Sequence, residues 1–335
     1  MGDRMTVALD VRCLEQPFSS YARVIRLIRS AANAVDLELK EWREGASGTD
    51  VLWTPDPTLP PVTDQPRLWI TVQDLNPMLP DGRPAWSRYR RARRYRKLID
   101  TIDRAAWRLA VPSLATAKSL QQHFPKLQTP LVQIPWFPAP EFQLDESLCP
   151  NKSLPKRGYV LYVGALRQHK NWPLVLQVYA ALPAALRAQH ALVMVGSGHR
   201  SGKQARVMAA QLGIASNVHW LEGLADADLP ALYQQAGVFL FPSLLEGFGL
   251  PPLEAQACGT PVIAAATSSL PEVLADSATL LNPHDAEAWV RATQLLLSDS
   301  SAAATAREAG LRNVTRYTPT FTGEAILSVL AEIDE

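Results

Sequence analysis

Two glutamates in the second half of the chain, Glu246 and Glu254, have side chains and a spacing that suit the binding of a polar ligand. They are eight positions apart. The first lies in a loop, and the second about one turn inside a helix expected to open at Pro251 and Pro252. Main-chain N–H groups at a helix start and the helix dipole favour anions, while carboxylates accept hydrogen bonds from hydroxyl groups. The pattern therefore suits a ligand that combines phosphate with several hydroxyl groups, which is the chemistry of a nucleotide sugar.

The elements expected around these glutamates are a strand, a glycine-containing loop, a helix and a second strand. Val238 to Phe241 and Pro261 to Ala265 are apolar runs typical of buried parallel strands, and Gly259 is a natural end for the helix between them. In sheets of this kind, ligands bind at the carboxyl ends of the strands. The alternative is that Glu254 is a solvated residue of the first helical turn and Glu246 an ordinary loop carboxylate.

The whole stretch PSLLEGFGLPPLEAQACGTPVIAAATSSLPEVL resembles the donor-site signature of retaining glycosyltransferases of family four, which have the GT-B fold. The resemblance implies an α/β protein of two Rossmann-like, doubly wound domains that face each other across a cleft. It also implies that Glu246 binds sugar hydroxyls and Glu254 binds the ribose. The N–H groups of the next four residues would line the sugar and the diphosphate: Gly247, Phe248, Gly249 and Leu250.

A second candidate segment, VGALRQHKN, follows another expected strand. Gly164 ends that strand and Lys170 lies six residues further on, where a lysine can neutralise phosphate as a point charge; a solvated surface lysine is the alternative. The segment resembles the diphosphate-binding loop of the same family, in which a lysine occupies the position of Lys170. Some members carry an arginine directly after the glycine; Ala165 stands there in this chain, so Arg167 is our candidate for that role. Gly196, after the next expected strand, begins a short glycine turn that would allow a ligand close to the backbone.

The first half of the chain offers one candidate for the acceptor side. Asp74 follows Gln73 at the end of a strand expected at residues 67–72. Family members often have His-Asp there, and a polar pair at this position could meet an acceptor hydroxyl. A simple turn is the alternative, because Asp and Asn before Pro77 favour turns. Residues 17–20, Pro-Phe-Ser-Ser, depart from the Gly-rich loop that members often carry, so we carry no contact over to this loop.

Strands and helices are expected to alternate along the chain, which indicates an α/β protein with parallel sheets. We expect an N-terminal, acceptor-side domain over residues 1–150, a polar linker at 143–157 and a C-terminal, donor-binding domain over 157–317. The resemblance implies that a last helix, about 318–335, packs back on the first domain. The expected strands span residues 5–11, 50–54, 67–72, 106–111, 131–135, 159–163, 191–195, 218–221, 238–241, 261–265 and 279–281.

The segment Arg83–Lys97 is the strongest local anomaly in charge. Eight of its fifteen positions are Arg or Lys, none is acidic, and Trp86, Tyr89 and Tyr95 are interleaved. One interpretation is the solvated face of a helix. Another is an anionic membrane surface, where each Lys or Arg contributes about 1 kcal/mol, and this would suit a lipid-linked acceptor. The same positive side chains could bind the phosphates of a nucleic acid. No other motif supports such binding, so we expect no nucleic-acid partner.

The bulk composition bounds the class of protein. A chain of 335 residues has room for two domains of the usual size, and an apolar fraction of 47% is enough for packed cores. The net charge of +1 provides no overall field that would attract nucleic acid. Three sparse cysteines indicate a reducing compartment. Because we find no apolar leader and no membrane-spanning run, we expect a cytoplasmic protein, peripheral at the inner membrane face if the basic segment binds lipid.

These features lead us to expect a retaining glycosyltransferase, a hexosyltransferase of polysaccharide biosynthesis, in which Glu246, Lys170 and Asp74 carry the catalytic steps. We expect GDP-mannose as the donor, with a UDP-sugar as the alternative, and a glycan or a lipid-linked molecule as the acceptor. The resemblance implies that no metal ion and no resident cofactor are needed, since the nucleotide sugar is a co-substrate. Two other classes stay open: a GT-B phosphorylase or epimerase, and a non-catalytic module that binds a nucleotide sugar.

Overall fold

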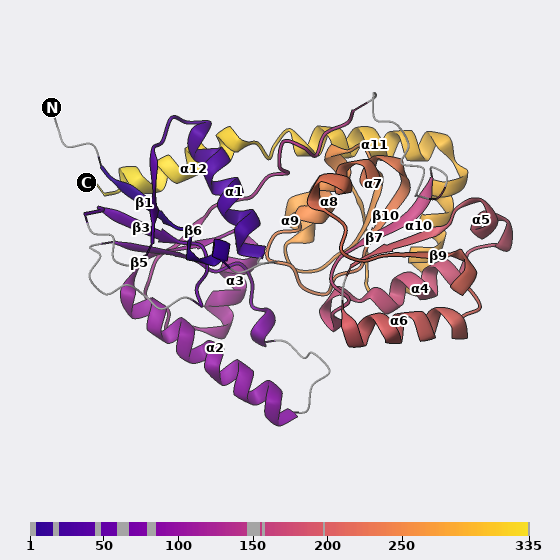
Figure 1. Cartoon of the computed structure of the whole chain (residues 1–335), viewed down its shortest axis with the longest axis horizontal. Coiled ribbons are helices and arrows are strands. Elements are labelled where there is room, and N and C mark those ends of the chain that lie inside the picture. Colours follow the sequence, from indigo (N-terminus) through magenta and orange to yellow (C-terminus); the bar gives the residue numbers. More distant parts are fainter. Residues whose placement is uncertain are drawn as a thin grey trace. The chain divides into compact units, whose positions relative to one another are not determined.

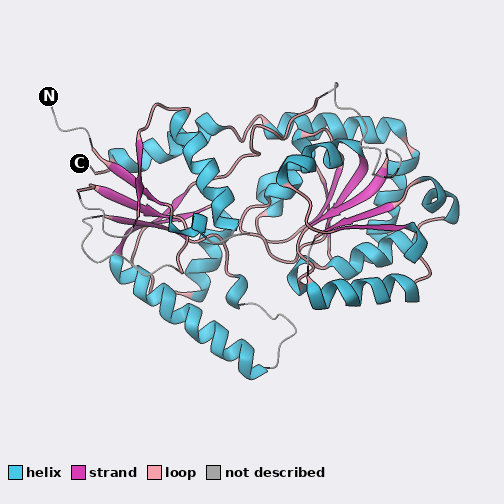
Figure 2. Cartoon of the chain, viewed as in Figure 1, coloured by secondary structure: helices cyan, strands magenta, loops and turns pink. Residues whose placement is uncertain are grey.

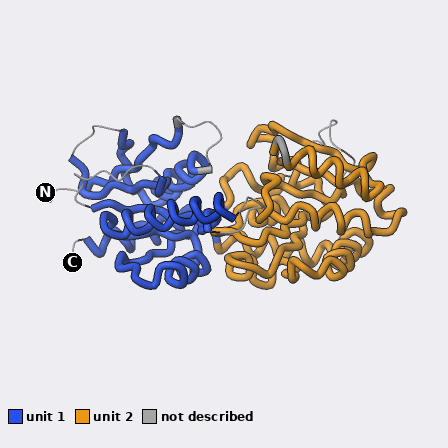
Figure 3. The backbone as a smooth tube through the Cα atoms, turned by 90° about the horizontal axis from the view of Figure 1, so that it is seen from below, with its two compact units in different colours: residues 1–137, 317–335 blue, residues 138–316 orange. Residues whose placement is uncertain are grey.

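The computed structural model describes residues 5–15, 20–43, 48–58, 67–78, 85–145, 155, 158–196 and 198–333. The chain divides into two compact units, Met1–Phe137 with Tyr317–Glu335, and Pro138–Arg316 (Figure 3). We predicted a division near residue 150, whereas the units separate between Phe137 and Pro138. Most of the expected linker, residues 17–19 of the expected loop, and Arg83 lie outside the described residues.

The first unit is built on a parallel six-stranded sheet with the order β2-β1-β3-β4-β5-β6. Helices α1 and α12 lie on one face of this sheet, and α2 and α3 on the other (Figures 1 and 2). The strands are β1 (Val7–Asp10), β2 (Leu39–Trp42), β3 (Val51–Thr54), β4 (Leu68–Thr71), β5 (Ala106–Val111) and β6 (Leu131–Gln133). The α-helices are α1 (Ser20–Asn33), α2 (Ala85–Ala105), α3 (Leu114–His123) and α12 (Pro319–Ala331).

The arginine-rich helix α2 is held by a narrow apolar stripe. Its buried residues are Tyr95, Ile99 and Ile102, which recur at the spacing of one helix face. They join strand residues such as Leu68 and Ile70 in one hydrophobic core. Burial of each large apolar side chain contributes about 1.5–3 kcal/mol, so three such residues can anchor a helix whose other faces are charged.

The C-terminal helix α12 belongs to the first unit, although the second unit precedes it in the sequence. It packs against α1. A Cβ atom added at Gly323 would lie 2.5 Å from the carbonyl oxygen of Ala31, so only glycine permits this close approach of two helices. The Thr322 hydroxyl donates to the carbonyl of Pro135 at 2.7 Å, and the Arg108 guanidinium forms an ion pair with Glu332 at 2.7 Å.

The second unit is built on a parallel six-stranded sheet with the order β9-β8-β7-β10-β11-β12. This is the 3-2-1-4-5-6 order of a Rossmann domain. Its strands are β7 (Tyr159–Val163), β8 (Leu192–Val195), β9 (Val218–Leu221), β10 (Ala236–Phe241), β11 (Val262–Ala265) and β12 (Thr279–Leu281). Its α-helices are α4 (Trp172–Ala181), α5 (Ala184–Gln189), α6 (His199–Gln211), α7 (Leu229–Gln235), α8 (Leu250–Ala257), α9 (Leu270–Leu274), α10 (Ala286–Ser298) and α11 (Ser300–Val314).

The central strands of this sheet are buried because helices cover both faces. Helices α7, α8 and α11 pack together, and α4 packs with α6 and with α10, so that the strands lie between layers of helices (Figure 1). The residues of β8 and the last four of β10 are all buried. Strands shielded on both faces require continuous apolar runs, which is the pattern that the sequence shows.

Two elements differ from the sequence-based expectation. The strand β2 was missed because its sequence, LKEW, lies at the edge of the sheet with two exposed residues, and an edge strand needs no apolar run. Residues 173–186 have a single helical pattern in the sequence, which predicts one helix, but α4 ends at Ala181 and α5 begins after Pro183. Proline disfavours the helical conformation of the residue before it, and Leu182 is extended here.

Candidate functional site

The candidate site lies where the strand order of the second unit reverses direction. Strands β7 and β10 are neighbours, but the chain runs from β7 outward to β9 before it returns at β10. The helices that follow the two strands therefore lie on opposite sides of the sheet, and the point where they diverge is where ligands bind in such folds. Lys170 follows β7, and Glu246 follows β10.

The side chains of Lys170 and Glu246 meet at this point. The Lys170 Nζ donates to the Glu246 Oε1 at 2.5 Å, and their side chains are 19% and 12% exposed. The ammonium also lies 5.5 Å from the centre of the Phe241 ring, close enough for a cation–π attraction. The structure thus brings a cation and a carboxylate together in a partly shielded position.

The two loops are joined by main-chain contacts. The N–H of Leu244 donates to the carbonyl of His169 at 2.7 Å, and the hydroxyl of Ser243 donates to the same oxygen at 3.3 Å. Asn171, directly after Lys170, adopts a left-handed conformation (φ 49°), and its amide donates to the carbonyl of Pro283 at 3.3 Å. The direction in which Lys170 projects is therefore set by neighbours on both sides.

Two serines of the turn after β11 hold the loop that contains Glu246. The N–H of Glu246 donates to the Ser268 hydroxyl at 2.9 Å. The buried Ser269 hydroxyl lies 3.1 Å from the carbonyl of Glu246 and 2.8 Å from that of Phe248. Sequence analysis missed both serines, and the Ser-Ser pair after a strand was the available signal.

The start of α8 supplies fewer main-chain donors than its position suggests. Gly249 precedes the helix with φ 108°, and a Cβ atom there would lie 2.7 Å from Leu270 Cδ2, so this position requires glycine. Pro251 and Pro252 in the first turn have no N–H. The main-chain donors available at this helix start are therefore those of Gly249 and Leu250.

Glu254 is fully buried inside α8. The hydroxyl of Tyr233 donates to its Oε2 at 3.4 Å. Burial raises the pKa of the nearby Cys258 thiol to about 12, and the Glu254 charge adds to the shift. The alternative in which Glu254 is a solvated residue of the first turn is therefore wrong.

The glycines of the β7 and β8 loops have a structural role. The N–H of Gly164 donates to Val195 at 2.9 Å, and a Cβ atom on Gly196 would lie 2.0 Å from the Gly164 carbonyl oxygen. The two loops touch through their backbones. Arg167 is exposed, and its guanidinium contacts no Glu or Asp of the described residues. The buried Tyr162 donates to the carbonyl of Ala165 at 3.4 Å.

Asp74 lies in the other unit and forms a turn. Its Oδ1 accepts the N–H of Asn76 at 2.8 Å and its Oδ2 accepts the Asn76 amide at 2.7 Å. Its carbonyl accepts the Tyr95 hydroxyl at 2.8 Å. The side-chain nitrogen of the adjacent Gln73 is buried without a partner among the described residues, while its oxygen accepts the Trp136 N–H at 3.0 Å.

A further polar cluster lies at the reversal point of the first sheet, between β1 and β3, and sequence analysis missed it. Asp10 and Asp56 are buried at the ends of these strands. Arg12 forms a two-pronged contact with Asp10, at 3.0 and 2.7 Å. Asp56 accepts both the N–H and the hydroxyl of Thr58, at 2.8 and 2.6 Å. The signal was an aspartate directly after an apolar run for Asp10, and an aspartate three positions after such a run for Asp56.

Comparison with known proteins agrees with this architecture. Sucrose-phosphate synthase from Thermosynechococcus elongatus superimposes with a TM-score of 0.73 at 16% identity, over 98% of this chain and 99% of that one. WaaG, a glycosyltransferase involved in lipopolysaccharide biosynthesis, superimposes with a TM-score of 0.71 at 17% identity, over 96% and 99%. The fold is therefore GT-B, as predicted.

Sequence comparison adds a family assignment for the second unit. Residues 148–312 match the sequence profile of glycosyl transferases group 1, and this part of the chain belongs to that family. O-antigen chain mannosyltransferase B of Escherichia coli is 39% identical over 135 residues, which are 39% of this chain and 35% of the relative. D-inositol 3-phosphate glycosyltransferase of Salinispora arenicola is 36% identical over 189 residues, 53% of this chain and 42% of the relative. The alignments thus span less than half the length of either relative.

Two further observations concern metal binding and membrane insertion. Within the described part of the chain, no three His, Cys, Asp or Glu side chains are grouped so that they could hold a metal ion. None of the described helices is both long enough and apolar enough to cross a bilayer.

Proposed function

We propose that the protein is a retaining glycosyltransferase that moves a hexose from a nucleotide sugar to a glycan or lipid-linked acceptor. The observation that carries this proposal is the contact of Lys170 with Glu246 at the reversal point of a group 1 domain. A cation and a carboxylate at one point match a donor whose diphosphate and sugar hydroxyls are neighbours.

Lys170 is proposed to bind the diphosphate of the donor. When the bond between the sugar carbon and the phosphate oxygen breaks, its electron pair and negative charge go to the diphosphate. A fixed ammonium and the N–H groups of Gly249 and Leu250 stabilise that charge as it develops. Glu246 accepts hydrogen bonds from the sugar hydroxyls and so fixes the reacting carbon. Arg167, which is exposed after the same strand, is a second candidate cation for the diphosphate.

Retention is proposed to follow from attack on the face that the diphosphate leaves. The acceptor hydroxyl oxygen bonds to the sugar carbon, and its proton passes to the departing phosphate oxygen. No protein base is then required. Asp74 is our candidate for holding the acceptor, because its turn follows the carboxyl end of β4. Exclusion of water during this step would suppress hydrolysis of the donor.

The ribose is proposed to be bound by Glu254. Its carboxylate lies about one turn inside α8 and is buried against Tyr233. The main-chain N–H groups of Gly247 and Phe248 complete the proposed contacts with the sugar and diphosphate.

GDP-mannose is our proposed donor, with a UDP-sugar as the alternative. The support is that several relatives, among them the one from Escherichia coli described above, are named as mannosyltransferases. A thermal-shift series with GDP, UDP, ADP and TDP tests the base, because a ligand at 100 times its Kd stabilises the native state by about 2.7 kcal/mol. The nucleotide sugar that carries the stabilising base is then incubated with candidate acceptors. NMR of the anomeric proton in the product tests both transfer and retention. An inverted product would refute the retaining mechanism.

The exposed part of α2 is proposed to hold the protein at an anionic membrane surface. Trp86 and Tyr89 are 65% and 69% exposed, and Arg90, Arg93 and Arg94 are exposed beside them. Aromatic and cationic side chains together suit the headgroup region of a bilayer. Such a contact would bring the enzyme to a lipid-linked acceptor at the inner membrane face.

A further inference from the structure

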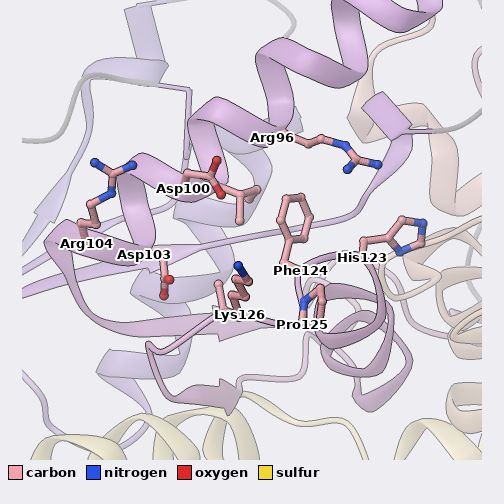
Figure 4. Close-up of a pocket in the computed structure, with 10 residues that line it drawn as sticks. Arg96, Asp100, Asp103, Arg104, His123, Phe124, Pro125 and Lys126 are labelled. Carbon is pink, nitrogen blue, oxygen red and sulfur yellow. The ribbon is translucent and has the colours of Figure 1, made fainter.

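A pocket of about 490 Å³ lies in the first unit, between α2 and the turn that follows α3 (Figure 4). Its volume falls in the range of small-molecule sites, about 300–1,000 Å³. Every residue that lines it belongs to the first unit, whereas the candidate donor site is formed by the second. The proposed transfer reaction uses none of these residues.

The walls of the pocket are held in place by hydrogen bonds. The carboxylate of Asp103 on α2 accepts the N–H groups of Gln128 and Thr129 at 3.0 and 2.8 Å. The Thr129 hydroxyl donates to the Asp103 carbonyl at 2.7 Å, and the N–H of Phe124 caps α3 by donating to Leu120 at 2.8 Å. The turn is thus fastened to the helix, and the charge of Asp103 is engaged by main-chain donors.

The remaining charged groups of the pocket have no such partners. Arg96, Asp100 and Arg104 follow one another at one-turn intervals on α2, and Lys126 reaches toward them from the turn (Figure 4). The charged side chain of none of the four forms a hydrogen bond or ion pair with another described residue. Three free cations therefore surround one free carboxylate, so the pocket favours an anion that also carries a hydrogen-bond donor.

The floor of the pocket is apolar. Ile99 is buried and lines the pocket, and the ring of Phe124, also buried, lies between the charged side chains (Figure 4). Carbon-bound hydrogens of a ligand would contact this floor while its polar groups face the rim. An inorganic ion would satisfy the cations but leave the floor unused and face repulsion from Asp100.

We propose that this pocket binds a phosphate ester. Arg96 and Lys126 hold the phosphate, because arginine donates to phosphate through two parallel hydrogen bonds and lysine acts as a point charge, and Arg104 adds positive charge at the other end of the pocket. Asp100 accepts a hydrogen bond from a hydroxyl or ammonium group of the same molecule. The phosphate can be that of a phospholipid headgroup or that of a soluble ester, and the two sources share this chemistry.

The first arm of the test uses a soluble ester. Glycerol 3-phosphate is titrated calorimetrically into the full chain at low ionic strength, without nucleotide sugar. We expect Arg96→Ala with Lys126→Ala to weaken its binding about tenfold or more. Lys40→Ala with Lys118→Ala removes two exposed cations of the first unit that lie outside the pocket and outside α2, and is expected to change binding less than twofold, or about 0.4 kcal/mol.

The second arm changes the carboxylate. Asp100→Asn is expected to weaken binding of glycerol 3-phosphate, since a charged acceptor is lost, and to strengthen binding of inorganic phosphate, since repulsion is removed. A cluster of cations with no defined geometry would instead bind both ligands more tightly after this substitution. That result would contradict the role assigned to Asp100.

The third arm separates the sources with vesicles of phosphatidylcholine alone and of phosphatidylcholine with phosphatidylglycerol. If only the anionic vesicles bind, and the pocket variant is released more than the Lys40 and Lys118 control, the ligand is a lipid phosphate. If glycerol 3-phosphate binds and depends on the pocket, a soluble ester is sufficient. Equal behaviour of the pocket variant and its control in both arms would overturn the proposal. Because every measurement omits the donor, failure here is independent of the proposed transferase activity.

Discussion

The ammonium of Lys170 and the carboxylate of Glu246 are in contact at 2.5 Å, although 76 positions separate them in the chain. Each therefore neutralises the other in the absence of a ligand. A phosphate competes with Glu246 for Lys170, and a hydroxyl competes with Lys170 for Glu246. A ligand that carries both groups can replace both halves of the contact, whereas phosphate alone leaves a partly shielded carboxylate without its cation.

Removal of the Glu246 carboxylate tests its proposed role on the sugar. We expect Glu246→Gln to lower kcat about 100-fold, since the negative charge is lost and one of the two acceptor oxygens becomes an NH2 donor while the shape is kept. The measurement is nucleotide release from the donor identified in the thermal-shift series. Thermal unfolding serves as the control and should change little, because partly exposed ion pairs contribute about 0–1 kcal/mol. A variant with normal turnover would remove Glu246 from the site.

Replacement of Lys170 tests whether Lys170 and Glu246 act together on the donor. Lys170→Ala is expected to raise the KM for the donor and lower kcat, because the diphosphate loses its cation. The double variant with Glu246→Gln should lose less activity than the product of the single losses, since residues in direct contact are not independent. Arg167→Ala is the comparison within the same loop, and a larger loss from it than from Lys170→Ala would transfer the cation's role to Arg167.

The glycine before α8 is expected to be sensitive to substitution. Gly249→Ala places a Cβ in a left-handed conformation and within 2.7 Å of Leu270 Cδ2, so we expect it to lower the free energy of unfolding by about 1–3 kcal/mol. Gly213 also has a left-handed φ, of 69°, but a Cβ there meets nothing within 4 Å. Gly213→Ala is thus the matched control for backbone strain alone. Urea unfolding measures both, and equal losses would show that the contact with Leu270 is unimportant.

The buried thiols predict how stability depends on alkaline pH. Burial raises the pKa of Cys13 to about 11, with contributions from the charges of Asp56 and Asp10, and that of Cys258 to about 12. Above about pH 9 the unfolded chain loses these protons while the native state keeps them, so stability falls as pH rises, by up to about 1.4 kcal/mol per pH unit for each thiol.

Cys258→Ser isolates one of these contributions. Its hydroxyl does not titrate in this range, so the slope of unfolding free energy between about pH 9 and pH 11 should be shallower than in the parent chain. Urea unfolding at several pH values measures the slope independently of the loss of stability at neutral pH. An unchanged slope would mean that the thiol titrates equally in both states.

The exposed face of α2 is expected to determine binding to anionic membranes. Arg90→Glu with Arg93→Glu and Arg94→Glu should lower co-sedimentation with phosphatidylglycerol vesicles several-fold, because each cation near the surface contributes about 1 kcal/mol. The control makes the same change in net charge at exposed positions of the second unit: Lys203, Arg291 and Arg312. If both triple variants lose binding equally, net charge rather than this helix governs the interaction.

Much of the second unit could be predicted because its signals are local. Its strands are shielded on both faces, so they appear as apolar runs, and the loops after β7 and β10 carry the family's motifs. The exposed strand β2 and the break before α5 were harder to predict from the sequence. At β2 the sheet edge removes the need for apolar residues, and at α5 a single proline decides between one helix and two.

The sequence by itself determined which residues could do chemistry at the carboxyl ends of the strands, because those residues lie next to their strands along the chain. Only the tertiary structure decided which of them meet. It brought Lys170 to Glu246, placed Ser268 and Ser269 under the same loop, and left Asp74 closed in a turn with Asn76. These contacts depend on strand order and long-range pairing, for which local apolar periodicity carries no signal.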